Sequence, residues 1–183
     1  MLYRWFPWAP DATSREPGGP LYVPRFDQGG GRHDNPDVYG AFYVSRVPAS
    51  PVAEILRDYA ARALPSQPLF REGAPSRLVA IDESAVGELL DLDDPRSLVA
   101  RELRPSGVAT RNRDRTQRVA LRLYEEGVTG FEWWSTIEAS WINVTLFEER
   151  VAGRLEVVGE PEPLTLDHPA VREAAEAVGV LLG

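Results

Sequence analysis

Three glycines followed by an arginine form the first feature of this chain with recognisable chemistry. Gly29, Gly30 and Gly31 precede Arg32, and His33 follows it. Glycine lets backbone amides approach a ligand closely, and a guanidinium presents a planar fork of donors that matches phosphate or carboxylate. The pattern therefore indicates an anion-binding turn. An arginine beside paired glycines is also common as a plain surface charge.

A tyrosine and a glutamate follow this turn on two predicted elements. Residues 41–44 are an apolar run typical of a strand, where Tyr43 fits an ordinary core aromatic with its hydroxyl at the rim. Ser50 as N-cap and a proline after it predict a helix over 51–63. Glu54 lies in the first turn, on the polar side of this helix, so it faces water or a water-filled cleft. A solvated glutamate favoured by the helix dipole is the alternative.

A pair of tryptophans marks a later predicted strand at 130–136. Alternation along a strand places Trp133 and Ser135 on one face and Trp134 on the other. One of the two tryptophans must therefore meet solvent, a ligand or a partner. Ser135 lies in no motif that would activate it as a nucleophile, so a hydrogen-bonding role fits it better.

Composition excludes several classes of chemistry. The chain has no cysteine, all 20 of its Lys and Arg residues are arginine, and its two histidines are His33 and His168. Thiolate catalysis, iron–sulfur clusters, cysteine zinc sites, a Walker lysine and Schiff-base chemistry are therefore absent, and no metal site is expected. Neither a GxSxG nor a GxGxxG pattern occurs. Arg, Asp, Glu, Ser, Thr, Tyr and Trp remain as the residues that could carry chemistry.

The charge balance disfavours nucleic acid as a partner. The net charge is −8, which repels polyphosphates at long range. A local exception is the cluster Arg111, Arg113, Arg115, Arg118 and Arg122, which fits either a solvated face or a site for a small anion or an acidic partner. No apolar stretch is long enough to span a membrane, and the opening segment does not resemble a signal peptide, so a cytoplasmic location is expected.

The 183 residues fit one domain, 1–183, of the α+β class, with mixed or antiparallel sheets and segregated helices. Asp114 and Gln117 resemble a capping box for a helix that ends at Gly127, and Asp167 is expected to cap a last helix that reaches Leu182. Besides the elements above, strands are expected at 2–5, 21–23, 77–81, 142–148 and 155–158.

In combination these features resemble the RES-domain family. The resemblance is carried by LYRWF near the start, by GGGRHDNPDVYGAFYVSRVPASPVAEIL, and by TQRVALRLYEEGVTGFEWWSTIEASWINVTLFE, in the order that the family has them. The family usually follows its arginine with Trp and Asn-Pro, whereas this chain is one residue longer there. Residues 64–114 carry no motif of the family.

The resemblance implies a fold similar to that of ADP-ribosyltransferases and a role as the toxin of a toxin–antitoxin pair, with an Xre-type antitoxin as partner. NAD would be the substrate, with no prosthetic group. The Arg, Glu and Ser that name the family would be Arg32, Glu54 and Ser135. Arg32 would hold the diphosphate, Glu54 would stabilise the cationic ribose, and Ser135 would hydrogen-bond the nicotinamide ribose.

In the same reading Tyr43 would pack against nicotinamide or ribose, and His33 and Trp133 would complete the substrate-binding set. The resemblance implies NAD cleavage at the nicotinamide–ribose bond, as a glycohydrolase or a phosphorylase. Water and inorganic phosphate remain open as acceptors. Two alternatives also stand: a protein ADP-ribosyltransferase, and a catalytically silent module that binds a partner.

Overall fold

The fold is organised around one twisted sheet. The computed structural model describes residues 1–64, 69–71 and 73–182. Its eight-stranded sheet has the order β4-β5-β1-β2-β8-β7-β6, and the eighth strand, β9, lies off this path and pairs with β5. The strands are β1 (Leu2–Pro7), β2 (Ala41–Ser45), β4 (Phe70–Arg71), β5 (Ala74–Asp82), β6 (Leu90–Asp91), β7 (Gly130–Trp134), β8 (Ile142–Phe147) and β9 (Glu156–Pro163).

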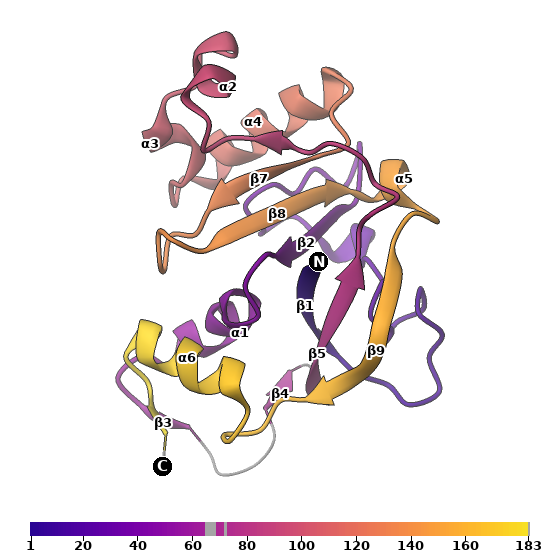
Figure 1. The fold of residues 1–183 in the computed structure, drawn as a ribbon, viewed down its shortest axis with the longest axis vertical. Coiled ribbons are helices and arrows are strands. Elements are labelled where there is room, and N and C mark those ends of the chain that lie inside the picture. The colour runs from indigo at the N-terminus through magenta and orange to yellow at the C-terminus, as the bar shows by residue number, and fades with distance from the viewer. Residues whose placement is uncertain (65–68, 72, 183) are drawn as a thin grey trace.

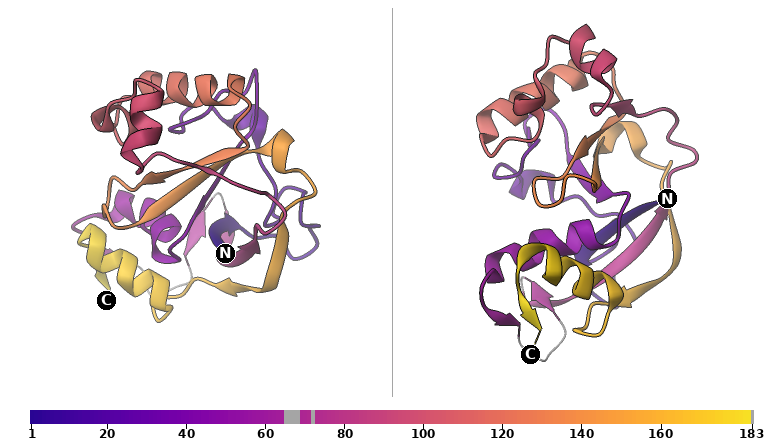
Figure 2. Two further views of the ribbon diagram at one scale, coloured as in Figure 1. Left: turned by 45° about the horizontal axis from the view of Figure 1, so that its top comes forward. Right: turned by 60° about the vertical axis from the view of Figure 1, so that its left-hand side comes forward.

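This sheet divides into two parts that separate between β1 and β2. Strand β1 pairs with β5 along its whole length, and β2 pairs with β8 along its whole length. Between β1 and β2, however, Tyr3 and Ser45 form a single Cα pair. Beyond that pair the two strands diverge, as Figures 1 and 2 show. The divergence opens space in the middle of the sheet that side chains or a ligand must fill.

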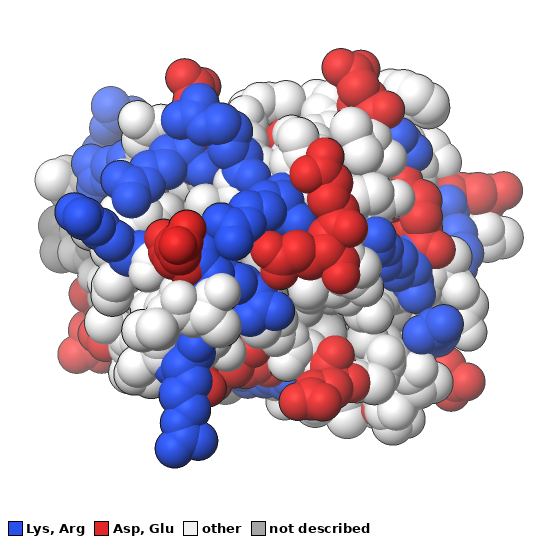
Figure 3. Space-filling model, turned by 90° about the horizontal axis from the view of Figure 1, so that it is seen from above, with Lys and Arg blue, Asp and Glu red and all other residues white. Residues whose placement is uncertain are grey.

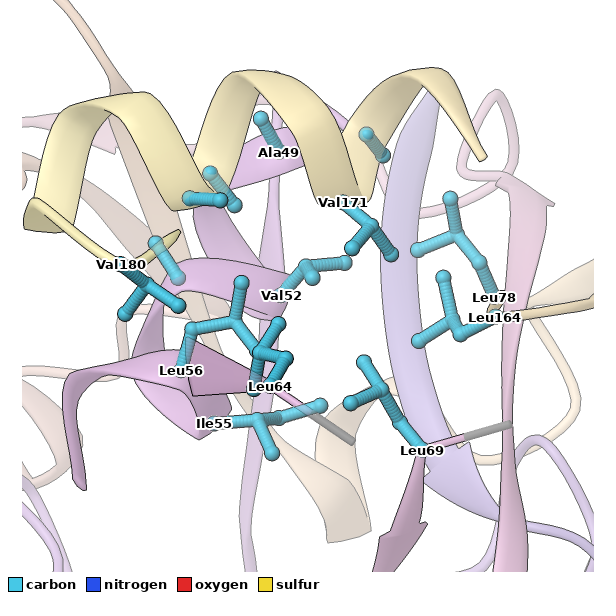
Figure 4. Packing of buried hydrophobic residues seen from close by; sticks show 14 of the residues in the cluster. Ala49, Val52, Ile55, Leu56, Leu64, Leu69, Leu78, Leu164, Val171 and Val180 are labelled. Atoms are coloured by element: carbon cyan, nitrogen blue, oxygen red, sulfur yellow. The ribbon is translucent and has the colours of Figure 1, made fainter. Parts of the chain in front are cut away.

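Helices cover the two parts separately. Helix α1 (Ala49–Leu56), which continues as the 3₁₀ turn η2 (Arg57–Tyr59), packs against α6 (Pro169–Val178). Their shared core includes Val52, Leu56 and Val171, as Figure 4 shows. Helix α4 (Arg113–Glu125) covers the β7–β8 part, where Leu123 packs with Phe131. The short helices α2 (Pro95–Ala100), α3 (Pro105–Val108) and α5 (Glu148–Val151), the 3₁₀ turn η1 (Arg25–Asp27) and the strand pair β3 (Ala63–Leu64) with β10 (Leu181–Leu182) complete the described elements.

The predicted α+β class is confirmed. Within the main sheet the described strands pair antiparallel except β6 with β7, and the helices gather at the two ends rather than alternating with strands. Because the chain between β6 and β7 holds α2, α3 and α4, that parallel pair has the long crossover that parallel strands need. Within the described residues, no helix has the length and apolar character needed to cross a membrane.

One predicted strand was wrong. Residues 21–23 are turn and irregular backbone, although Leu21 and Val23 are buried as a strand would require. Leu21 N donates to Ser14 O and Tyr22 N to Gly19 O, so the backbone donors are satisfied within the loop. The burial pattern was therefore correct, but its cause is a loop packed on the sheet.

The helix predicted over 51–63 is shorter and begins earlier. It starts at Ala49, and Ser50 lies inside its first turn with its hydroxyl donated to Asn143 Oδ1 at 2.7 Å rather than capping the helix. At the other end Ala61 adopts a left-handed φ of 62°, and Ala63 belongs to a strand. The helical geometry ends one residue before Ala61, at Ala60, whose ψ is 133°, and the chain then turns into β3 instead of extending α1.

Two predicted caps were displaced by one or two residues. Asn112 caps α4, where its side chain accepts from Arg115 N at 3.0 Å, and His168 caps α6 by accepting from Ala170 N at 3.1 Å. Asp114 and Asp167 are therefore not the capping residues. The remaining predicted strands and helices are present, with ends that shift by a few residues, except that Leu182 lies in β10 rather than in the last helix.

Candidate active site

A cavity of about 770 Å³ lies where the two parts of the sheet separate. Strand β1 contributes Trp5, β2 contributes Tyr43, α1 contributes Glu54, and the glycine turn contributes Arg32. The volume falls within the range of small-molecule sites, roughly 300–1,000 Å³. Two residues that the sequence could only place on separate elements, Arg32 and Glu54, therefore line one cavity.

The Arg32 side chain is held from several directions. Its Nη1 donates to Thr110 O, its Nη2 donates to Thr136 Oγ1 at 3.3 Å, and its guanidinium lies 4.9 Å from the Trp133 ring centroid. Burial lowers the pKa of Arg32 to about 10, and the positive charge of Arg113 acts in the same direction, while Glu54 opposes both. Arg32 thus remains a cation at neutral pH, with its orientation fixed before any ligand arrives.

Asp34 organises the glycine turn in front of Arg32. Its Oδ2 accepts from Gly29 N at 2.9 Å and from Gly31 N at 2.6 Å, and its Oδ1 accepts from the Tyr43 hydroxyl at 2.6 Å. A Cβ on residue 31 would lie 2.4 Å from Asp34 Oδ1, so glycine is required there for the carboxylate to reach the backbone. Charge-assisted bonds of this kind make the turn rigid.

Helix α4 braces the same turn from the other side. Thr116 Oγ1 donates to Arg32 O, and Gln117 Nε2 donates to Gly29 O at 3.1 Å and to Gly31 O at 2.9 Å. These bonds satisfy carbonyls that a loop would otherwise leave to solvent. Gln117, expected as part of a capping box, is a brace of the anion-binding turn instead.

Glu54 lines the cavity from the second turn of α1. Because the helix begins at Ala49, Glu54 is too far from its N-terminus for the helix dipole to account for its position. Its carboxylate pairs with Arg57 Nη1 at 2.9 Å, and 35% of its side chain is exposed. The residue lines a cleft and is partly exposed, as its place on the polar side of the helix predicted.

Tyr43 and His33 lie differently with respect to the cavity. Tyr43 lines it, but its hydroxyl is buried in the turn, where it donates to Asp34 and accepts from His33 N at 2.8 Å, and burial raises its pKa. His33 is 2% exposed and lies outside the lining residues, against Phe131 and Trp133 at ring distances of 4.9 and 5.1 Å. His33 therefore packs behind Trp133, which lines the cavity, and does not line the cavity itself.

The end of β7 presents the tryptophan pair and the predicted serine. Trp133 lines the cavity, and Trp134 is half-buried on the opposite face of the strand, in the alternation that was predicted. Ser135 is 3% exposed, its Oγ accepts from Ile137 N at 3.1 Å, and it is not among the lining residues. The structure brings Arg32, Tyr43, Glu54 and Trp133 together and leaves the Ser135 hydroxyl in a turn beside them.

Comparison with known proteins identifies the family. Residues 2–167 match the RES domain. The chain belongs to the RES-domain family. Its fold is similar to a solved structure, "Crystal structure of the M.tuberculosis MbcT-MbcA toxin-antitoxin complex", with a TM-score of 0.59 and 21% identity, covering 97% of this chain and 87% of that chain. No curated protein matches.

The RES domain of this chain also places residues at the cavity that sequence reasoning missed. Asn143 lines it, with its Oδ1 engaged by Ser50, and Arg113 lines it from the start of α4. Arg113 belongs to the basic cluster noticed in the sequence, but nothing in that cluster distinguishes the one member that turns inward. Among the described residues no group of three or more His, Cys, Asp and Glu could hold a metal ion.

Proposed function

We propose that this RES domain is the toxin of a toxin–antitoxin pair and degrades NAD by cleaving its nicotinamide–ribose bond. The observation that carries the proposal is that Arg32 and Glu54 line a single cavity large enough for a nucleotide-sized ligand. Membership of the RES family supports it, as does the fold shared with a chain from a toxin–antitoxin complex.

The two residues supply what this cleavage needs. Nicotinamide leaves as a neutral group from a cationic precursor, so no acid is required to expel it. The ribose carbon becomes positive in the transition state, and the Glu54 carboxylate stabilises it by charge and by hydrogen bonding to a ribose hydroxyl. Arg32 binds the diphosphate and so converts binding energy into placement of the bond that breaks.

The remaining lining residues would shape the site around the substrate. Tyr43 has its hydroxyl committed to Asp34, so it would offer its ring to nicotinamide or ribose. Trp133 supports the Arg32 guanidinium from below and donates its Nε1 proton to Thr145 Oγ1 at 3.1 Å, which fixes the plane of the indole. Both rings are therefore preorganised before binding.

An antitoxin of the Xre type is the partner that the proposal includes. The complex that contains the similar fold pairs a toxin with an antitoxin. Co-expression tests this part: growth arrest on expression of the chain, relieved by a helix-turn-helix protein encoded beside it, is the expected result. Growth arrest that such a neighbour does not relieve would contradict it.

Release of nicotinamide from NAD tests the enzymatic part. We expect the purified protein to release nicotinamide, measured by chromatography, without any added protein acceptor. Addition of phosphate distinguishes ADP-ribose 1-phosphate from ADP-ribose as the product. Glu54→Gln keeps the size of the side chain and is expected to lower kcat by about 10²–10³, the loss seen when one preorganised electrostatic group is removed.

The control for that variant is its thermal unfolding, which should match the wild type because the Glu54 side chain is partly exposed and lies outside the core. Release that requires a protein acceptor would favour an ADP-ribosyltransferase. No release by the wild type, or unchanged release by Glu54→Gln, would contradict the proposed mechanism.

A further inference from the structure

The segment that carries α2, α3 and α4 is strongly basic in an acidic protein. Residues 95–125 contain eight arginines against three acidic residues, whereas the whole chain has a net charge of −8. Figure 3 looks onto the molecule from the side of these helices and shows basic side chains gathered over part of that face. Most of these arginines are exposed, as solvated charges are expected to be.

Two of them, Arg101 and Arg113, are half-buried, and Arg101 pairs with Glu126, which leaves Arg113 as the one of interest here. It begins α4, is half-buried, and lines the cavity that Arg32 and Glu54 also line. Its Nη1 atom is buried without a hydrogen-bond partner among the described residues. A buried guanidinium nitrogen with no acceptor is costly, because it has lost water and gained nothing in return.

The surroundings of Arg113 add to that cost. After burial, its charge is the next cause that lowers the pKa of Arg32, and after burial and Arg32 it also lowers the pKa of His33. Glu54 lines the same cavity, but its carboxylate pairs with Arg57. Arg32 and Arg113 are therefore two neighbouring cations, and neither forms an ion pair with a carboxylate of the described residues.

We propose that Arg32 and Arg113 together form a diphosphate-binding site, in which each guanidinium takes one phosphate of an organic diphosphate. This assignment rests on the proposed function, because NAD is the diphosphate that the cavity would bind. Each phosphate of a dinucleotide carries a negative charge, so the ligand supplies the counter-charge that no carboxylate of the described residues gives to these two guanidinium groups. Planar guanidinium forks match phosphate oxygens, which favours this pairing.

The size of the cavity favours a diphosphate ester over a free phosphate. Its volume is about 770 Å³, far more than a single phosphate fills, and its lining includes the aromatic residues Trp5 and Tyr22 as well as Glu54. A ligand held by its diphosphate between two arginines therefore has room for the groups attached to each phosphate. The site would therefore select dinucleotides and ADP-ribose over nucleoside monophosphates.

Calorimetric titration with ADP-ribose and with AMP tests the assignment, because these probes share adenosine and differ in the second phosphate. We expect wild type to bind ADP-ribose more tightly, and Arg113→Gln to weaken ADP-ribose by at least about tenfold, the loss of one charge-assisted bond. AMP binding should change less. Arg118→Gln removes an exposed charge from the same helix and is expected to leave ADP-ribose binding near that of wild type.

Thermal unfolding separates a binding role from a structural one. Without ligand, Arg113→Gln should unfold at the same temperature as wild type or higher, because the repulsion between two cations is relieved. With ADP-ribose, the stabilisation seen in wild type should be largely lost. A lower unliganded unfolding temperature, with equal losses for AMP and ADP-ribose, would overturn the assignment.

The outcomes for this site and for NAD cleavage can be told apart. Diphosphate binding that depends on Arg113, in a protein that releases no nicotinamide, would support the site and contradict the proposed reaction. NAD cleavage with unchanged KM in Arg113→Gln would support the reaction and overturn the site. Wild type that binds neither ADP-ribose nor NAD would overturn the site as well.

Discussion

Glu54 and Arg57 form an ion pair of 2.9 Å at the end of α1, inside the cavity that Arg32 also lines. The pair joins the proposed catalytic carboxylate to a cation three residues along the chain, so Glu54 has one preferred orientation before substrate binds. The Glu54 side chain is 35% exposed and the Arg57 side chain 47% exposed, which limits what the pair contributes to the free energy of unfolding.

The first prediction concerns the role of Arg57 in positioning. Arg57→Gln should lower kcat for NAD by about two- to fivefold, since an exposed pair is worth about 0.2–1 kcal/mol, and should leave KM and the unfolding temperature nearly unchanged. Steady-state kinetics and thermal unfolding measure the three quantities. A loss in kcat as large as that of Glu54→Gln would mean that Arg57 itself touches the reacting groups.

The second prediction concerns the glycine turn. Asp34→Ala leaves Gly29 N, Gly31 N and the Tyr43 hydroxyl without their acceptor, so we expect a loss of about 2–4 kcal/mol in the free energy of unfolding and a higher KM for NAD. Urea unfolding measures the first effect. Asp37→Ala, which removes an exposed aspartate three residues further on, is the matched control and should change neither quantity.

Tyr43→Phe separates the hydroxyl from the ring in the same turn. It removes one of the three donors to Asp34 and keeps an aromatic ring in the cavity, so its cost should be smaller, about 0.5–1.5 kcal/mol. If Asp34→Ala lowered the free energy of unfolding no more than Asp37→Ala does, the hydrogen bonds to Asp34 would not stabilise the turn, and the contacts from α4 alone would hold it.

The sequence predicted the parts of this site that have local signals. The glycines before Arg32, the strand of Tyr43 and the helix of Glu54 each follow from patterns within about a dozen residues. The brace from α4 has no such signal, because Thr116 contacts Arg32 O across 84 positions of sequence. For the same reason Arg113 could not be distinguished from its exposed neighbours.

The errors in the fold have a similar origin. Leu21 and Val23 are buried like strand residues, but the backbone of their segment bonds within the loop and pairs with none of the described strands. Ser50 has the composition of an N-cap, yet its hydroxyl is donated to Asn143, a residue of a distant strand. Tertiary contacts decided both cases against the local pattern.

The third prediction follows from the burial of His33. Burial lowers its pKa well below the usual value, and its Nδ1 lies 2.8 Å from Thr145 Oγ1. The unfolded chain therefore takes up a proton near pH 6.5 that the folded protein refuses. Stability should be full above that pH and fall as the pH decreases below it, by up to about 1.4 kcal/mol per pH unit.

Urea unfolding between pH 5 and 8 measures this dependence. His33→Gln should unfold with a flatter pH profile, while His168→Gln, at a residue that pairs with Glu162 near the surface, should retain the steep part of the profile. A wild-type profile that His33→Gln does not flatten would show that carboxylates, rather than His33, cause the loss of stability in acid.

The last prediction concerns the end of β7, where the family serine corresponds to Ser135. Its hydroxyl accepts from Ile137 N, whereas the next residue, Thr136, accepts from Arg32 at 3.3 Å. The Ser135 hydroxyl holds the turn that contains Thr136, and Thr136 contacts Arg32, so both side chains act through the orientation of Arg32. Ser135→Ala and Thr136→Val should each raise KM for NAD about two- to fivefold and leave kcat unchanged, the effect of one weak hydrogen bond.

The split between KM and kcat distinguishes this indirect route from direct contact with substrate. If Ser135→Ala lowered kcat by a hundredfold while Thr136→Val did not, the Ser135 hydroxyl would have to reach the reacting ribose. That result would mean that the turn from Ser135 to Ile137 rearranges when NAD binds, because the hydroxyl is 3% exposed without ligand and does not line the cavity.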